Sequence, residues 1–226
     1  MRIGFVSKGA LRDFKEDTLC CEEKTGEKTD LLLFGFESLG EVNYEKELKG
    51  GSNFFSDVAL LSKQLKNVVV CGCVTDLRGL KRKSAIVAEN GKLLGVSDML
   101  NAVDGATNGG AALRVYETKA GRMGVAVADD LHFPDVVKSL SVCGCDFVVC
   151  PFGVVKNSLQ SVLLRAYSFC YGIPIFFCGE GYCMISDTKG EIVFASPQSP
   201  TYTCFQKVTE YHLIQTRKRG SFRPTI

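Results

Sequence analysis

The chain has 226 residues, of which 46% are hydrophobic, and its 27 basic and 25 acidic residues give a formal net charge of +2. This length and composition predict one domain, residues 1–226, with a sizeable buried core. The balanced charge argues against nucleic acid or an anionic membrane as the main partner. The basic residues Arg217–Arg219 and Arg223 lie in a short C-terminal tail from about residue 207, which we expect to be solvated or to line an interface.

No secretory signal or membrane span is expected, because no stretch approaches the roughly 20 apolar residues that cross a bilayer. Most of the 11 cysteines fall within apolar runs, where a free thiol behaves as a small hydrophobic group. This usage predicts a cytoplasmic protein rather than a disulfide framework. The Cys-Gly-Cys triplets at 71–73 and 143–145 are spaced more closely than zinc ligands usually are, so we expect packing roles and no metal or organic cofactor.

Short runs of Val, Ile, Leu and Phe alternate with helical patterns in the first half of the chain. The strongest local signal is Asn90-Gly91, because Asn-Gly between apolar runs favours a tight hairpin. The expected order is a strand at 2–6, a polar helix at about 10–24, a strand at 31–34, a helix at 52–65, a strand at 68–73, and a hairpin of 84–89 with 92–96.

The same order of elements recurs about 110 residues later, without sequence identity between the halves. Pro134 suits the first turn of a helix, and the Gly- and Ala-rich stretch 102–112 between the halves reads as a loop. The expected elements are strands at 122–127 and 147–150, helices at 134–141 and 157–170, a strand at 173–178, and a hairpin of 183–186 with 191–194. Two such units predict two mixed sheets that stack face to face with helices outside.

Four segments carry motifs in a fixed order: Asp30–Gly35, the hairpin from Ser84 to Val96, Gly124–Asp135, and the helix and hairpin from Arg165 to Gly190. Together, over roughly residues 2–206, they resemble the nitrilase, or carbon–nitrogen hydrolase, superfamily. In that resemblance the first three segments correspond to a general-base glutamate, a catalytic lysine and a nucleophilic cysteine. The resemblance implies a four-layer α-β-β-α sandwich built from two stacked mixed β-sheets.

The family's Glu–Lys–Cys chemistry lets a thiolate attack an amide or nitrile carbon while lysine stabilises the oxyanion. Here Ala128 stands at the nucleophile position and Met99 at the lysine position, and neither can perform that role. The glutamate position falls on Phe36 by strict spacing, or on Glu37 if the strand carries one extra residue. A shift of one residue turns a side chain to the other sheet face, so Glu37 is a residual base only where the backbone bulges.

The neighbouring residues allow several readings. Asp129 directs an acidic group toward the cleft, where it binds a cationic ligand or meets solvent, and Asp130 is expected to bond the backbone of the turn. His132 fits a surface or interface position better than a catalytic one. Cys150 and Cys178 end strands at the sheet edge where α/β proteins place ligands, so each is either a displaced thiol nucleophile or a packed strand end.

The leading hypothesis is a nitrilase-fold pseudoenzyme that acts as a binding or regulatory subunit through a retained cleft. The alternative is a hydrolase of small amides, or of other non-peptide C–N bonds, that uses a displaced cysteine. A small amide or acid is the expected ligand. The resemblance also implies a homodimer through the apolar face Val136, Val137 and Leu140, and a heteromer with an active homologue is a further reading.

Overall fold

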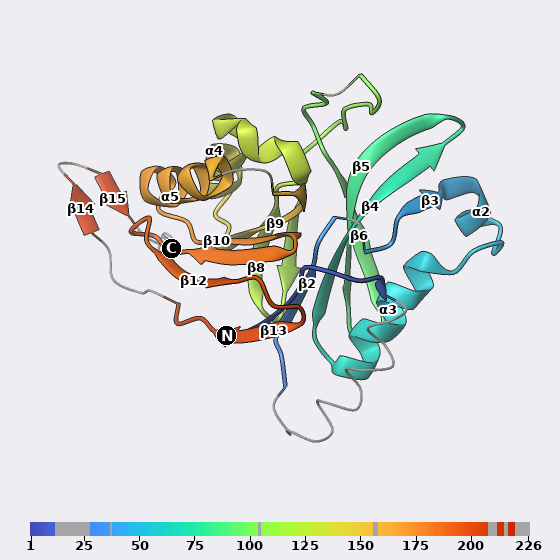
Figure 1. Ribbon diagram of the computed structural model, residues 1–226, viewed down its shortest axis with the longest axis horizontal. Coiled ribbons are helices and arrows are strands. Elements are labelled where there is room, and N and C mark those ends of the chain that lie inside the picture. The colour runs from blue at the N-terminus through green and yellow to red at the C-terminus, as the bar shows by residue number, and fades with distance from the viewer. Residues whose placement is uncertain are drawn as a thin grey trace.

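Two β-sheets stack face to face in this computed structural model, and helices cover their outer faces (Figure 1). The structure describes residues 1–11, 28–36, 38–103, 105–155 and 158–207, and the backbone of 212–214 and 217–219. The helix expected at about 10–24 lies outside these residues apart from its first two positions, as do Glu37 and most of the basic tail. The expected four-layer α-β-β-α sandwich is confirmed.

The first sheet carries the N-terminal half of the chain and one strand from its end. Its order is β13-β1-β2-β4-β5-β6, with β3 beside β4. Strands β1, β2 and β4 run parallel, and β13 closes the edge antiparallel to β1. The strands are β1 Arg2–Val6, β2 Leu31–Phe34, β3 Glu41–Asn43, β4 Val68–Leu77, β5 Leu80–Glu89, β6 Lys92–Asp98 and β13 Thr201–Cys204.

The second sheet has the order β12-β11-β10-β9-β8-β7 and repeats the pattern, with a parallel centre formed by β8, β9 and β10. Its strands are β7 Val115–Thr118, β8 Gly121–Val125, β9 Phe147–Val154, β10 Ile175–Glu180, β11 Tyr182–Ser186 and β12 Ile192–Ser196. The helices are α2 Tyr44–Leu48, α3 Phe54–Leu65, the 3-10 helix η1 Ala128–His132, α4 Pro134–Val142 and α5 Leu159–Tyr171, and a ribbon joins β14 His212–Ile214 to β15 Arg217–Arg219.

The central core lies between the two sheets. Alternate residues of each strand point into it, so Ile3 and Phe5 of β1 meet Val149 of β9 and Phe176 of β10 in one buried cluster. Its aromatic rings are in contact, with Phe176 stacked on Phe147 at 5.1 Å between ring centroids. Burial of this apolar surface is the main force that holds the sheets together.

Two further cores lie under the outer helices. Helix α3 packs Val58 and Leu61 against the first sheet, and α4 and α5 pack against the second sheet. Val136, Val137 and Leu140 of α4 are at most 3% exposed, because they face this core. The expectation that these three side chains form a dimer contact is therefore wrong, because they are already covered within the chain.

The predicted hairpin at Asn90-Gly91 is confirmed, and both residues have the positive φ that a tight turn needs. Sequence reasoning missed β3, β7 and β13, which have only three or four residues each. It also ended the 68–73 strand early, because β4 continues to Leu77 with a mixed polar sequence. The early start of β5 brings Lys83 to the cavity described below.

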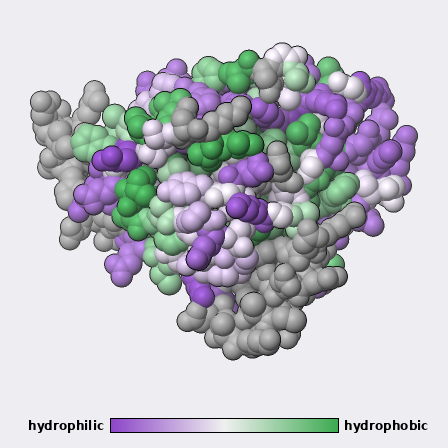
Figure 2. All heavy atoms as spheres, in the orientation of Figure 1, coloured by the Kyte–Doolittle hydropathy of each residue, from purple (hydrophilic) through white to green (hydrophobic). Residues whose placement is uncertain are grey.

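Hydrophobic side chains reach the surface over the layer of α4 and α5, whereas the side of α2 and β3 is mainly hydrophilic (Figure 2). On α5, Leu159, Val162 and Phe169 are 45, 57 and 40% exposed. No helix within the described residues is both long and apolar enough to cross a membrane.

We predict that Phe176→Ala lowers the free energy of unfolding by about 3–5 kcal/mol, because it opens a cavity between the sheets. The matched control is Phe169→Ala on α5, whose ring is 40% exposed, with an expected loss of about 1 kcal/mol or less. Urea unfolding followed by circular dichroism measures both. Equal losses would contradict the central core as the main source of stability.

Candidate functional site

The turn after β8 keeps an unusual backbone at the position where the resemblance places the nucleophile. Ala128 has φ +48°, a left-handed conformation that costs an L-residue such as alanine roughly 1–2 kcal/mol. The residue is 3% exposed and opens the 3-10 helix η1. Strained turns persist only when the surrounding structure holds them. The turn that would present a nucleophile is therefore retained although the side chain is a methyl group.

Hydrogen bonds of the Asp130 side chain help to hold this turn in its strained conformation. Its fully buried carboxylate accepts hydrogen bonds from the backbone N–H of Leu100 at 2.9 Å, from the backbone N–H of Asn101 at 3.0 Å, and from Asn101 Nδ2 at 3.0 Å. Burial raises the pKa of the Asp130 carboxyl, and these hydrogen bonds partly oppose that shift. The carboxyl also has the expected hydrogen bond to its own turn, at the backbone of Val127. The bonds from Leu100 and Asn101 add a link between the two sheets, because Leu100 follows β6 of the first sheet.

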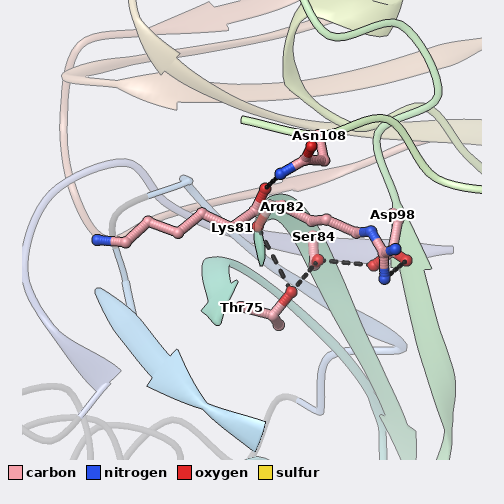
Figure 3. A network of polar contacts seen from close by, with 6 residues as sticks. All are labelled: Thr75, Lys81, Arg82, Ser84, Asp98 and Asn108. Carbon is pink, nitrogen blue, oxygen red and sulfur yellow. Dashed lines mark hydrogen bonds and ion pairs between the residues drawn. The ribbon is translucent and has the colours of Figure 1, made fainter. Parts of the chain in front are cut away.

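Met99 lies directly before this link and is fully buried. Its backbone N–H donates to Lys83 O at 2.8 Å, and its carbonyl accepts from Gly110 N at 2.7 Å. A polar chain on the opposite face of the sheet fixes the end of β6: Thr75 Oγ1 lies 2.9 Å from Ser84 Oγ, which donates to Asp98 Oδ1 at 2.7 Å (Figure 3). The thioether at the lysine position is thereby held inside the core.

Phe36 occupies the third position. It is 7% exposed, and its backbone N–H donates to Phe152 O of β9 at 2.9 Å, so the loop after β2 also bridges the sheets. Its backbone passes directly over Gly72, where a Cβ would meet Phe36 Cα. This contact explains the glycine of the 71–73 triplet, while Cys71 and Cys73 are buried in the core beneath α3.

Phe36, Met99 and Ala128 all belong to the buried apolar core between the sheets, and Phe36 and Ala128 also line one cavity. This cavity has a volume of about 490 Å³. Its walls combine aromatic and aliphatic side chains with a few polar ones. They are Phe36, Lys83, Ala128, Asp129, His132, Phe152, Gly153, Val154, Leu159 and Gln160.

The polar side of the cavity contains an ion pair across the two sheets. Lys83 Nζ of β5 donates to Asp129 Oδ2 at 2.6 Å, and the two side chains are 20 and 19% exposed. His132 Nδ1 lies 3.7 Å from Asp129 Oδ1, and its ring packs edge-on against Phe152. Asp129 and His132 thus both line the cavity. The pairing with Lys83 balances the charge of Asp129, which weakens the case for a cationic ligand.

Lys83 and Gln160 were missed by sequence reasoning. Lys83 is two residues before Ala85 and four before Val87, which face the core between the sheets, so strand alternation could have placed its side chain inward. Gln160 stands near the start of a predicted helix, where nothing in the sequence distinguishes a buried amide from a solvated one. The lysine is the more informative omission, because it puts a cation beside Ala128.

The two candidate thiols do not reach the cavity. Cys150 and Cys178 are fully buried, and neither lines it. Burial raises the pKa of the Cys150 thiol, and the nearby charges of Asp130 and Asp129 raise it further. Burial likewise raises the pKa of Cys178. Glu37 lies outside the described residues, and within them no three His, Cys, Asp or Glu side chains gather in a way that could hold a metal ion.

Comparison with known proteins identifies the family of the chain and supports its fold. The sequence model of the family described as carbon-nitrogen hydrolase matches residues 42–218. The chain therefore belongs to the carbon–nitrogen hydrolase family, and it has the fold of the nitrilase superfamily.

Among curated relatives, the mouse protein named deaminated glutathione amidase is 29% identical over 124 residues, which are 49% of this chain and 38% of that protein. The human protein of the same name is 29% identical over 115 residues, covering 45% of this chain and 35% of that protein. The aligned segment thus spans little more than a third of these relatives.

Among solved structures, a cysteine-to-alanine variant of the Nesterenkonia AN1 amidase, from the nitrilase superfamily, gives a TM-score of 0.75. It is 17% identical, and the match covers 89% of this chain and 88% of that one. Another structure of this amidase carries acrylamide added at its active site cysteine; it gives a TM-score of 0.74 at 16% identity and covers 89% and 91% of the two chains. At this identity the likeness concerns the fold.

We predict that Asp130→Asn lowers the free energy of unfolding by about 2–4 kcal/mol, because an amide cannot replace the buried carboxylate as acceptor of all its hydrogen bonds. Urea unfolding measures the loss, and hydrogen exchange at Leu100 and Asn101 should accelerate. Asp135→Asn, in the exposed first turn of α4, is the control and should cost about 1 kcal/mol or less. Unchanged exchange at Leu100 would refute the link between the sheets.

A second prediction concerns the crossing of Phe36 over β4. Gly72→Ala should cost about 1–3 kcal/mol, because the added methyl group forces the Phe36 backbone away. Gly153→Ala is the control: its Cβ would meet no atom within 4 Å, so its effect should stay within about 1 kcal/mol. Thermal unfolding compares the two variants, and equal midpoints would contradict the close approach.

Proposed function

We propose that this chain is a catalytically inactive member of its family, which binds a small molecule in the retained cavity and serves as a binding or regulatory subunit. The observation that carries the proposal is that Phe36, Met99 and Ala128 are all apolar and buried in the core between the sheets. These are the positions at which the family resemblance calls for a base, a lysine and a thiol.

Cysteine-dependent hydrolysis needs a nucleophilic atom and a stabilised oxyanion. The methyl group of Ala128 has no lone pair, and Met99 carries no charge. Lys83 does bring a cation to the cavity, and it pairs with Asp129 there. A cation alone forms no acyl intermediate, so the polar residues that remain favour binding over covalent chemistry.

The preserved turn supports a retained use of the cavity. An inactive protein has no chemical need for a left-handed alanine, yet Ala128 keeps that conformation and Asp130 holds the turn in place. The cavity of about 490 Å³ is of a size that small-molecule sites commonly have. The names of the relatives, amidases, suggest that an amide or the corresponding acid is the ancestral ligand.

The reading of an active hydrolase with a displaced cysteine finds little support. A reactive thiol needs access to substrate and a low pKa, whereas Cys150 and Cys178 are fully buried and the pKa of each is raised. Native alkylation of one of these thiols much faster than the other cysteines would restore that reading.

The assembly of such a subunit is a separate part of the proposal. Self-association, or pairing with an active homologue, would suit a regulatory role. The exposed apolar residues Leu159, Val162 and Phe169 of α5 offer a surface for either.

Restoring the lost groups tests the proposal. The combined variant Phe36→Glu, Met99→Lys and Ala128→Cys should be alkylated by iodoacetamide at position 128 and should release ammonia from small amides. The control keeps Ala128 with the other two changes and should release none. Because each oxyanion donor is typically worth about 10²–10³ in rate, Ala128→Cys alone, which keeps the buried Met99, should be far slower. Ammonia release by the unmodified protein at the rate of the combined variant would refute the proposal.

A further inference from the structure

The two Cys-Gly-Cys triplets of the chain have different surroundings, although their sequences are identical. The first triplet, 71–73, lies inside β4, and both of its cysteines are fully buried. The second triplet, 143–145, follows helix α4, where Cys143 is exposed and Cys145 is 5% exposed. Neither thiol of the second triplet lines the cavity. The second triplet therefore joins a thiol that solvent reaches to one that the core covers.

The backbone of the second triplet forms a tight turn. Gly144 has φ +76°, and the N–H groups of Gly144 and Cys145 donate to Ser141 O at 2.9 Å and to Leu140 O at 3.3 Å. Helices commonly end on glycine in this way. In an extended strand, Cα atoms two residues apart are separated by about 6.6–6.8 Å, which is the upper limit of the roughly 4.4–6.8 Å that a disulfide spans. A turn brings its ends closer, so the second triplet suits a disulfide better than the first.

The sulfur of Cys145 packs against the second sheet. A Cβ on Gly124 of β8 would lie 3.1 Å from Cys145 Sγ and equally close to the side chain of Leu140. Burial raises the pKa of the Cys145 thiol to about 12. Such a thiol is a slow nucleophile, whereas Cys143 is accessible to a dissolved disulfide. The exposed cysteine is thus the one that reacts first.

We propose that Cys143 and Cys145 form a reversible redox pair, which closes to a disulfide on oxidation by glutathione disulfide. The Cys143 thiolate attacks one sulfur of glutathione disulfide, forms a mixed disulfide and releases one glutathione thiolate. Cys145 then loses its proton to solvent, attacks the Cys143 sulfur and displaces the second glutathione. The two electrons that the protein thiols lose reduce glutathione disulfide to two glutathione molecules.

The closed pair is expected to open readily. A ring closed across one intervening residue is small and strained, and strained disulfides are the more easily reduced ones. Closing the ring also draws Cys145 Sγ away from Gly124 and Leu140, which costs packing. The pair therefore responds to the ratio of oxidised to reduced glutathione. Because it lies apart from the cavity, this response does not depend on what the cavity binds.

Mass spectrometry of tryptic peptides tests the pair, because trypsin separates the two triplets. Residues 67–78 carry the first triplet, and residues 139–156 carry the second together with Cys150. The native protein is incubated with glutathione disulfide, and free thiols are then blocked with N-ethylmaleimide in denaturant. Peptide 139–156 should lose two hydrogens and carry one label, on Cys150, whereas peptide 67–78 should carry a label on each cysteine. Excess reduced glutathione should restore labelling of every cysteine in peptide 139–156.

Variants assign the two steps. Cys145→Ala should stop the reaction at the mixed disulfide, so that glutathione stays on Cys143. Cys143→Ser should give neither a glutathione adduct nor a disulfide on this peptide. Cys170→Ser is the matched control, because it removes an exposed thiol near the end of α5 and should leave closure of the pair unchanged. Since both steps need thiolates, closure should be faster at about pH 8.5 than at about pH 7.

Full labelling of peptide 139–156 after oxidation would overturn the inference, as would glutathione that stays on Cys143 in the unmodified protein. Equal or faster closure of the first triplet would also overturn it, because the turn and the exposure of Cys143 would then make no difference. Closure of the second triplet alone, reversed by reduced glutathione, supports it.

Discussion

The carboxylate of Asp130 joins the two sheets at the point where they form the cavity. It lies in the turn after β8 of the second sheet and accepts hydrogen bonds from the backbone after β6 of the first. That link fixes Ala128 in its left-handed conformation and places Met99 in the core beside it. Since burial raises the pKa of Asp130, holding the charged form there costs free energy, which the backbone donors partly offset. The positions of Ala128, Asp129 and His132 depend on this junction, because they lie in the same short helix as Asp130.

The cavity is lined by both apolar and polar side chains. Which positions are apolar explains the proposed loss of catalytic activity. Apolar side chains fill the positions where the family resemblance calls for catalytic groups, and the backbone that would present those groups stays in place. Polar side chains also line the cavity, where Lys83 and Asp129 form an ion pair across the sheets. Under the proposed function, such a site binds its ligand without a nucleophile.

Much of the architecture could be predicted from the sequence, because buried strands and amphipathic helices leave strong periodic patterns. The hairpin at Asn90-Gly91 and the helix beginning at Pro134 are confirmed in type and place. Strand β13 could not be predicted, because it is four residues long and pairs with β1 at the other end of the chain. In the site, the family resemblance pointed to Ala128, which lines the cavity, and to Met99, which is buried in the core. Lys83 and Gln160 could not be found in this way, because tertiary packing brings them to the cavity. Of the two alternatives for the glutamate position, Phe36 lines the cavity and Glu37 lies outside the described residues.

The most direct test of the central claim uses the unmodified protein. Intact-mass spectrometry after incubation with a panel of small amides, nitriles and activated esters, with ammonia followed in parallel, reports both a covalent intermediate and turnover. The absence of a nucleophile at Ala128 and the burial of Cys150 and Cys178 predict no acyl adduct and no ammonia. An adduct mapped to a single cysteine, together with ammonia release, would show that the chain hydrolyses its substrate with a displaced thiol.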